Sequence, residues 1–392
     1  MISLSTADNA LKNVYLEVIT DQLKNAVDPF FAKIEQTTQS VAGNEIKKMV
    51  PLGINGGIGA GTEIGALPTA KENSYATLTS KLKNLYGTIE ISDKAIRASR
   101  DEAGAFLNLL NAEMENLIES SKFNFRRMLY SNGTGLLGTS EVFVPGEDYI
   151  TLAEGAVGAV GMYVDVYNSN NEPIPELQNV EIVDTDDKNC TITLSTIIPE
   201  KYEDETKLYV YLSNSKGKEF IGLAGICDSS ITSLYGINRL NVSYMTGGTT
   251  SLTSSQFTMP KFMQLIDDIR LNYDGNVDFI TSSFSFRRKL QEKLKASAFN
   301  TDVMNLAGGS KTITFNGVPV VATRFCPENS AYLLDSTVFH LHQLCDWTWL
   351  SNNKGEVLHQ RENYATHIAT LVKYCDLICD RPNRVLKLTV TN

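Results

Sequence analysis

Apolar residues recur at spacings of three and four from residue 99 to residue 133, the pattern of one buried face of an amphipathic helix. Ser99 and Glu102 have the spacing of a capping box at the start, and Asn132-Gly133 favours a left-handed stop at the end. About 30 residues at 1.5 Å each predict a helix roughly 45 Å long, a spine for the rest of the chain. The face consists of Phe106, Leu110, Met114, Leu117, Ser121, Phe125 and Met128, of which Leu110, Met114 and Leu117 are the predicted core.

A second helical pattern occupies residues 4–36 and is interrupted at Pro29, because proline breaks the hydrogen bonding of a helix. The segment has no catalytic signature. It either docks on its own subunit or forms an arm that reaches a neighbour. Its apolar face consists of Leu11, Tyr15, Val18, Ile19, Leu23 and Val27.

Between the two helical patterns lies a glycine-rich segment, residues 51–68, which precludes a stable helix and weakens any strand. Gly56 and Gly61 have the outer spacing of a phosphate-binding loop. Thr62-Glu63, however, stands where such a loop has Lys followed by Ser or Thr. We therefore expect a long excursion of the chain. Residues 75–91 then alternate as strands around a break at Gly87, so the excursion has strand arms and leads into the long helix.

The stretch from residue 139 to residue 220 alternates short apolar-polar runs with Asn, Asp and Pro turn clusters, which predicts a small antiparallel sandwich or barrel. Asp184 and Asp186 resemble the opening of a calcium loop. Lys188 and Asn189 occupy the next ligand and glycine positions, so we expect an exposed turn.

Residues 221–364 combine helical and strand patterns and predict a mixed α/β domain. Pro260 opens one helix and Ser285 another, with a short buried strand over residues 277–281 between them. Asn316-Gly317 between two strand patterns is a strong hairpin signal. The second helix carries basic side chains, which form either a solvated face or a contact with nucleic acid or an acidic neighbour. These are Arg287, Arg288, Lys289, Lys293 and Lys295.

Composition narrows the class of protein. The 392 residues suffice for two or three domains, and no run approaches the 18 apolar residues of a membrane span. A net charge of −10 argues against a protein that coats nucleic acid with most of its surface, but permits contact over a small area. The N-terminus lacks a secretory signal, and the six cysteines show no CxxC pair, so we expect reduced thiols in a cytoplasmic product.

No catalytic constellation is recognisable. The sequence has neither a G-x-S-x-G elbow nor an HExxH motif. His340 and His342 share one face of a predicted strand, but no third ligand follows at metal spacing. We therefore predict that the chain is not an enzyme and has no catalytic, cofactor-binding or metal site.

The order of these parts resembles the major capsid proteins of tailed bacteriophages, the Hong Kong 97-type fold. The local likenesses are Leu82-Lys-Asn-Leu-Tyr-Gly-Thr-Ile-Glu-Ile-Ser-Asp leading into the spine, Phe220-Ile-Gly-Leu-Ala-Gly-Ile, and Leu234-Tyr-Gly-Ile-Asn-Arg239. The resemblance implies an α+β fold with five parts. They are an N-terminal helical arm (1–45), an extended β-loop (46–92), a peripheral domain with the spine helix (93–138 with 365–392), an inserted β-rich domain (139–220) and an axial α/β domain (221–364).

The resemblance also implies a function. Copies of the chain would assemble as hexamers and pentamers into an icosahedral head shell around phage DNA, in the host cytoplasm, and remain in the virion. The founding family member has a longer N-terminal scaffolding segment, so we expect a separate scaffolding protein, together with a portal and limited DNA contact. The alternatives are an encapsulin-like compartment shell and, from another class, a hydrolase or adhesin that uses the β-rich part as a binding module.

The extended loop is the predicted assembly element. It has too few large apolar side chains for a core of its own, and ordering a residue costs about 1–2 kcal/mol, so an adjacent subunit is its natural support. The alternative is a disordered surface loop. Some family members cross-link a loop lysine to a neighbour's asparagine, and Lys71 is the nearest candidate here, but the sequence does not identify a partner for it. The loop residues assigned to assembly are Gly56, Gly57, Gly59, Gly61, Gly65 and Lys71.

Overall fold

A computed structural model of the protein describes residues 28–51, 53–94, 103–153, 158–186, 188–296, 303–305, 311–352 and 354–391. The capping box at Ser99 and Glu102 and most of the expected N-terminal helix lie outside these residues. The described end of that segment forms the 3-10 helix η2 (Phe31–Lys33) and strand β1 (Glu35–Thr37). After the predicted interruption at Pro29, the helical pattern to residue 36 is therefore not realised as an α-helix.

The spine is helix α4 (Ala103–Tyr130), whose 28 residues span about 42 Å. Leu110, Met114 and Leu117 are buried along one side of it. The chain leaves the helix through Gly133, whose φ of +81° is a conformation that glycine adopts without strain. The helix is therefore followed at once by a sharp change of direction.

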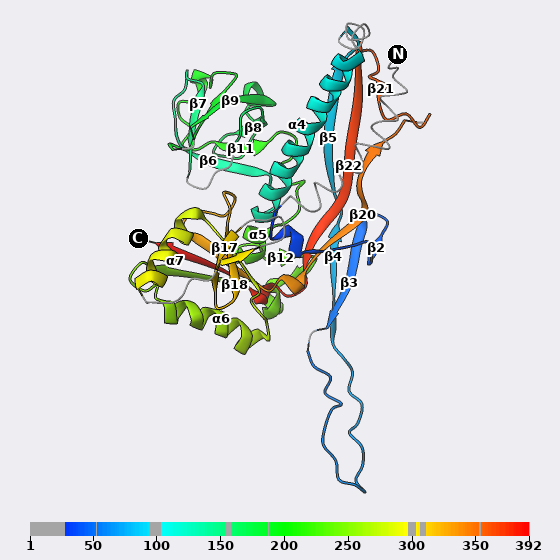
Figure 1. Ribbon diagram of the computed structural model, residues 1–392, viewed down its shortest axis with the longest axis vertical. Coiled ribbons are helices and arrows are strands. Elements are labelled where there is room, and N and C mark those ends of the chain that lie inside the picture. Colours follow the sequence, from blue (N-terminus) through cyan, green and yellow to red (C-terminus); the bar gives the residue numbers. More distant parts are fainter. Residues whose placement is uncertain are drawn as a thin grey trace.

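A long sheet lies along α4 (Figure 1). Its strand order is β1-β20-β22-β21, and β5 pairs with the other side of β22, away from β20 and β21. An added Cβ at Gly87 in β5 would lie 2.7 Å from Leu117 Cδ1, so glycine lets the helix cross the strand closely. The strands are β5 (Lys83–Ser92), β20 (Phe339–Leu350), β21 (His359–Gln360) and β22 (Thr366–Cys379).

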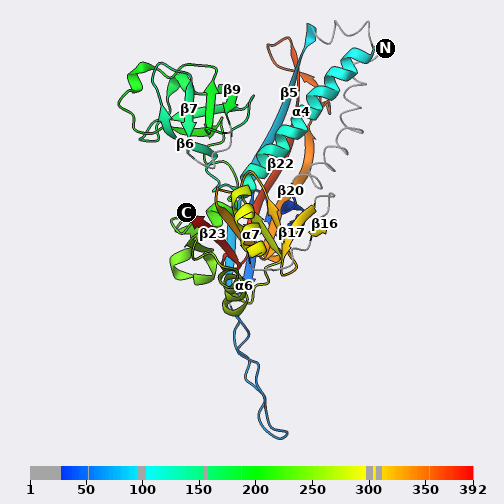
Figure 2. The same ribbon diagram turned by 60° about the vertical axis from the view of Figure 1, so that its left-hand side comes forward.

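The extended loop rises from a separate sheet of order β2-β3-β4. Strands β3 (Glu45–Pro51) and β4 (Tyr75–Lys81) pair antiparallel from Glu45 opposite Lys81 to Pro51 opposite Tyr75, with β2 (Val41–Ala42) beside β3. Figures 1 and 2 show the rest of the loop projecting from these two strands as two extended segments side by side, away from the body of the subunit.

The β-rich segment is a closed barrel of order β10-β7-β6-β11-β8-β9, with its own apolar core. It stands beside α4 in both views (Figures 1 and 2). The Asp184–Asp186 region ends in an exposed turn, where Asp186 accepts hydrogen bonds from the backbone of Lys188 and Asn189. The elements are β6 (Leu136–Phe143), β7 (Tyr149–Leu152), β8 (Tyr163–Tyr167), η3 (Pro175–Leu177), β9 (Val180–Asp186), β10 (Thr191–Leu194), η4 (Glu200–Tyr202) and β11 (Tyr209–Leu212).

The axial part is a seven-stranded sheet of order β14-β23-β19-β15-β18-β17-β16. Helices α6 (Met259–Tyr273) and α7 (Phe284–Ala296) share an apolar core with one face of this sheet, and the other face joins the core under α4. The strands are β14 (Gly248–Thr253), β15 (Phe279–Ser282), β16 (Val303–Asn305), β17 (Lys311–Phe315), β18 (Val318–Ala322), β19 (Ser330–Leu334) and β23 (Val385–Thr391).

Short elements connect these parts. Arg239 is buried and donates to the backbone carbonyls of Met245 and Asp228, which holds the connection after the barrel in a compact fold. None of the helices in the described ranges is long and apolar enough to cross a membrane. The short elements are α5 (Leu223–Cys227), β12 (Ser233–Leu234), β13 (Ile237–Asn238), η5 (Arg239–Asn241), η6 (Ser243–Met245), η7 (Ser336–Val338) and η8 (Pro382–Arg384).

The sheets divide the chain differently from the expected boundary at residues 364–365. Strands β20 and β21 precede that boundary, yet they pair with β22 in the long sheet. Strand β23 follows it, yet β23 lies between β14 and β19 in the axial sheet. Alternation in a sequence predicts a strand but does not predict which strands pair with it, and both differences concern strand pairing.

Candidate assembly surfaces

The distal part of the extended loop is exposed and carries apolar side chains. Residues 53–74 form neither helix nor strand, and apart from Gly57 they are all exposed. The exposed fractions of the large apolar side chains are 97% for Ile54, 85% for Ile58, 98% for Ile64 and 87% for Leu67. Apolar side chains so fully in water favour burial against another surface.

The predicted loop residues lie along this exposed part of the loop, residues 53–74. Gly56 and Gly57 face Lys71 and Ala70 across the loop, and Gly59 faces Pro68, at distances that an added Cβ would fill. Gly65 donates its N–H to the carbonyl of Thr62, 3.1 Å away, and forms the turn at the tip. Gly61 lies in the same turn region, where an added Cβ would lie 3.9 Å from the carbonyl oxygen of Ala66. The two limbs of the loop therefore run close together, with the apolar side chains in water.

The root of the loop is fastened to the body. Lys48 Nζ in β3 lies 2.7 Å from Asp380 Oδ2, and the backbone N–H of Thr79 in β4 donates to the carbonyl of Tyr235. Ile46, Val50 and Leu78 are buried in the main core. A rigid root and an exposed tip make the loop an arm held out from the subunit.

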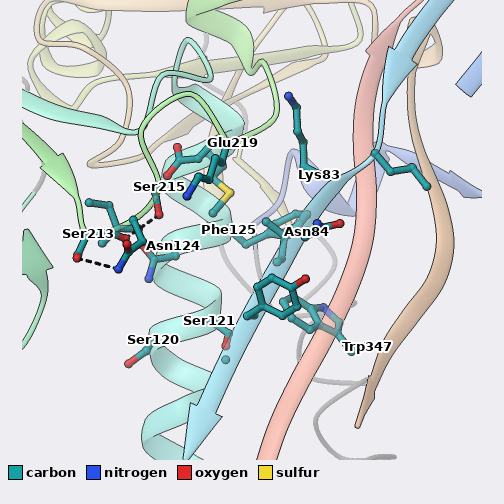
Figure 3. Close-up of a pocket in the computed structure, with 18 of the residues that line it drawn as sticks. Lys83, Asn84, Ser120, Ser121, Asn124, Phe125, Ser213, Ser215, Glu219 and Trp347 are labelled. Atoms are coloured by element: carbon teal, nitrogen blue, oxygen red, sulfur yellow. Dashed lines mark hydrogen bonds between the residues drawn. The ribbon is translucent and has the colours of Figure 1, made fainter. Parts of the chain in front are cut away.

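A groove lies between α4, the strand after the loop and the segment that leaves the barrel. Its cavity volume is about 840 Å³. Figure 3 shows α4 on one side of it, with Ser120, Ser121 and Asn124 on that helix, and Ser213 and Ser215 on the barrel segment. The lining residues are 81–87, residues 117, 120, 121, 124, 125 and 128 of α4, residues 212–215 and 217–219, and Trp347.

A buried ion pair closes one side of the groove. Arg127 of α4 donates from both terminal nitrogens to the two carboxylate oxygens of Glu219, and its Nη1 lies 3.0 Å from Oε2. The side chains are only 3% and 2% exposed. Bidentate pairing in this environment is strong and directional, so it fixes the barrel segment on the spine. Leu117, one of the predicted core residues, forms part of the floor.

Titratable groups near the loop root respond to burial. Burial raises the pKa of Asp376 in β22 to about 6, against lowering contributions from a hydrogen bond with Ser80 and from the charge of Lys83. Burial likewise lowers the pKa of His342, whose Nδ1 lies 2.8 Å from the carbonyl of Gln39. These are structural groups, because they lie in packed strands and not in the groove.

The histidine pair does not form a metal site. His340 lies 3.1 Å from Glu35 through Nδ1 and 3.1 Å from Asp380 through Nε2. Within the part of the chain that the structure describes, no group of three or more His, Cys, Asp or Glu side chains could hold a metal ion. No disulfide joins any of the six cysteines, all of which lie in the described ranges, and burial raises the pKa of Cys227 and Cys375 to about 12. Buried thiols of this kind are inert.

Sequence reasoning found the loop but missed the groove. Residues 81–87, part of α4, residues 212–215 and 217–219, and Trp347 build the groove, and no pattern within any one of them shows that they meet. The break at Gly87 in an alternating strand was the one local signal, since glycine in a strand marks a close approach by another element.

No family model and no curated protein matches the sequence. Solved structures do match. The capsid asymmetric unit of cyanophage A-1(L) has a TM-score of 0.53 at 11% identity, covering 96% of this chain and 93% of that chain. The holo-SrpI encapsulin complex of Synechococcus elongatus PCC 7942 has a TM-score of 0.46 at 11% identity, and the match covers 93% of this chain and 88% of that chain. The capsid of a native GTA particle has a TM-score of 0.47 at 9% identity, and the match covers 93% of this chain and 91% of that chain. The cyanophage match shows that this chain has the expected α+β fold, the Hong Kong 97-type capsid fold.

Proposed function

We propose that this chain is the major capsid protein of a tailed phage, a structural subunit that assembles into a closed shell and catalyses no reaction. One observation carries the proposal: the same chain has an arm with an exposed apolar tip and a groove elsewhere on its surface. The capsid fold supports it, since the cyanophage structure with this fold is a capsid. The groove of one copy would receive the loop of the next.

The two surfaces are different, so the contact between copies is head-to-tail. Figures 1 and 2 show the loop extending away from α4 and the barrel, which border the groove. A head-to-tail contact closes into a ring when the fixed rotation between neighbours is one fifth or one sixth of a full turn, as pentamers and hexamers require. The contacts at the root of the loop matter here because a loosely attached loop would not fix the rotation that relates one subunit to the next.

The energy of one such contact is modest. Burying an aliphatic side chain contributes about 1.5–3 kcal/mol, so the exposed side chains Ile54, Ile58, Ile64 and Leu67 supply roughly 6–12 kcal/mol. Ordering the loop backbone opposes this at about 1–2 kcal/mol per residue fixed. A single contact is therefore weak and reversible, and ring closure stabilises the assembly because it gives the two end subunits of an open chain the contact that each lacks.

Loop replacement tests the proposal. A variant in which a short Gly-Ser turn replaces residues 53–70 should stay folded and soluble but form no closed particles in sedimentation and electron microscopy. A finer variant, I58S/I64S/L67S, keeps the loop length and should assemble poorly. Its matched control is L240S/L271S, because these two leucines are similarly exposed but lie outside the loop and the groove. Particles of normal size from the loop variants would refute the role of the loop.

The contents of the shell separate phage capsid from encapsulin. A phage head purified from infected cells holds nuclease-protected DNA, whereas an encapsulin-like shell would hold an enzyme and no genome. A separate scaffolding protein and a portal are part of the phage proposal. A soluble monomer with hydrolytic or adhesive activity would contradict both shell functions.

A further inference from the structure

Helix α7 concentrates positive charge in an acidic protein. The chain has 35 Lys and Arg against 45 Asp and Glu, a net charge of −10. The 13 residues of α7 include Arg287, Arg288, Lys289, Lys293 and Lys295 but only one acidic residue, Glu292. A local field of this sign on a protein of the opposite net charge points to a specific partner, since solubility alone does not require it.

The cations lie on the outer side of the helix. Phe286, Leu290 and Leu294 are buried in the core between α7 and the axial sheet. Arg288 and Lys295 are exposed, and Arg287 and Lys293 are half-buried at the flanks. Figure 2 shows α7 lying across the axial sheet on the side turned to the viewer, with no other element in front of it.

Two of these cations have contacts within the fold, since Lys289 Nζ donates to the carbonyl oxygen of Val390, 3.2 Å away, and the Arg287 guanidinium lies 5.4 Å from the centroid of the Phe284 ring. Among the described residues, no ion pair joins Arg288, Lys293 or Lys295 to a carboxylate, although Glu292 lies about one turn from both Arg288 and Lys295. Lys293 and Lys295 suit the negative end of the helix dipole, but Arg287 and Arg288 stand near its positive end, where cations are unfavourable. Lys289 and Lys293 also repel each other at a spacing of four. Arg288, Lys293 and Lys295 are therefore the cations of α7 that can serve a partner outside the subunit.

We propose that the outer face of α7 binds the phosphate backbone of duplex DNA inside the shell. This inference rests on the proposed capsid function and names the surface that meets the packaged genome. The helix is about 20 Å long, which matches roughly six base pairs at 3.4 Å each. Lys and Arg on a short face contact phosphates and not base edges, so the binding is independent of sequence. A small face on an acidic subunit gives weak, salt-sensitive affinity, as packaged DNA that must later leave requires.

The test measures binding of the full-length subunit to a fluorescent 30-base-pair duplex of mixed sequence, by anisotropy between 25 and about 200 mM salt. The variant R288E/K293E/K295E reverses three charges on α7. The control K188E/K207E/K354E reverses three exposed lysines of the barrel and of the segment after β20, outside both α7 and the groove, and so changes the net charge equally. Melting temperatures establish that both variants are folded.

The α7 variant should lose at least tenfold in affinity at the lower salt, and the slope of log K against log salt should fall by roughly two to three, about 0.9 per lost phosphate contact. The control should change affinity less than threefold. Equal losses in both variants would overturn the inference, because they would reflect net charge alone. So would displacement of the duplex by polyglutamate at equal charge concentration, which would indicate an acidic protein partner.

Assembly of the same two variants separates this inference from the proposed function. Closed particles from the α7 variant, together with weakened DNA binding, support both. Closed particles with unchanged DNA binding overturn only the role of α7. Absence of particles from the unaltered chain overturns the capsid function itself, whatever the DNA measurement shows.

Discussion

Breaking the buried pair between Arg127 and Glu219 should destabilise the subunit strongly. Glu219→Gln keeps the shape of the side chain but removes its charge, which leaves the Arg127 guanidinium buried without a counter-ion. Breaking a buried pair by removing one partner costs about 3–5 kcal/mol. At about 2 °C per kcal/mol for a large domain, the melting temperature should fall by at least roughly 6 °C.

Thermal unfolding followed by near-ultraviolet circular dichroism measures this effect in unassembled subunits. The matched control is Glu176→Gln, which removes the same charge from the exposed pair with Lys201 on the barrel, and it should leave the melting temperature unchanged. The double variant Arg127→Met/Glu219→Leu should recover most of the loss, because apolar residues of similar size replace a buried ion pair at little cost.

The result that would refute the reasoning is a small shift for Glu219→Gln, equal to that of the control. The pair would then contribute nothing to stability, and the barrel segment would be held on the spine by packing alone. A double variant as unstable as the single one would show that the loss comes from misfitting side chains and not from an unpaired charge.

Two further predictions concern the body of the subunit. Leu117→Ala should cost about 2–5 kcal/mol in unfolding free energy, since it empties buried volume under α4, and an unchanged melting temperature would show that this helix face is assigned wrongly. Burial raises the pKa of Asp376 to about 6, so its ionisation opposes folding as pH rises from about 4 to 6, by roughly 3 kcal/mol. Asp376→Asn should therefore raise the melting temperature at pH 7.5 but not at pH 4, and equal effects at both would contradict this.

Elements that depend on local pattern could be predicted from the sequence. The apolar face around Leu110 and Met114 identified the spine because a buried helix face repeats every three to four residues. Asn316 and Gly317 identified the hairpin because both adopt positive φ, 51° and 78°, as its turn requires. The barrel followed from regular alternation between turn clusters.

Features that depend on distant contacts could not be predicted. Strand β23 reads like any other exposed-buried alternation, and only its neighbours β14 and β19 place it in the axial sheet. The groove escaped prediction for the same reason, since its walls meet only in the folded chain. Glu219 looked like an ordinary surface carboxylate, because no sequence signal shows that Arg127 lies opposite.

The most direct test of the central proposal is a symmetric cryo-electron-microscopy reconstruction of particles assembled from the unaltered chain. The proposal predicts closed shells in which residues 53–74 of each subunit lie in the groove of its ring neighbour, against α4 and residues 212–219, with Ile54, Ile58, Ile64 and Leu67 buried. Shells with empty grooves and loops in solvent, or a chain that remains monomeric under all assembly conditions, would contradict it.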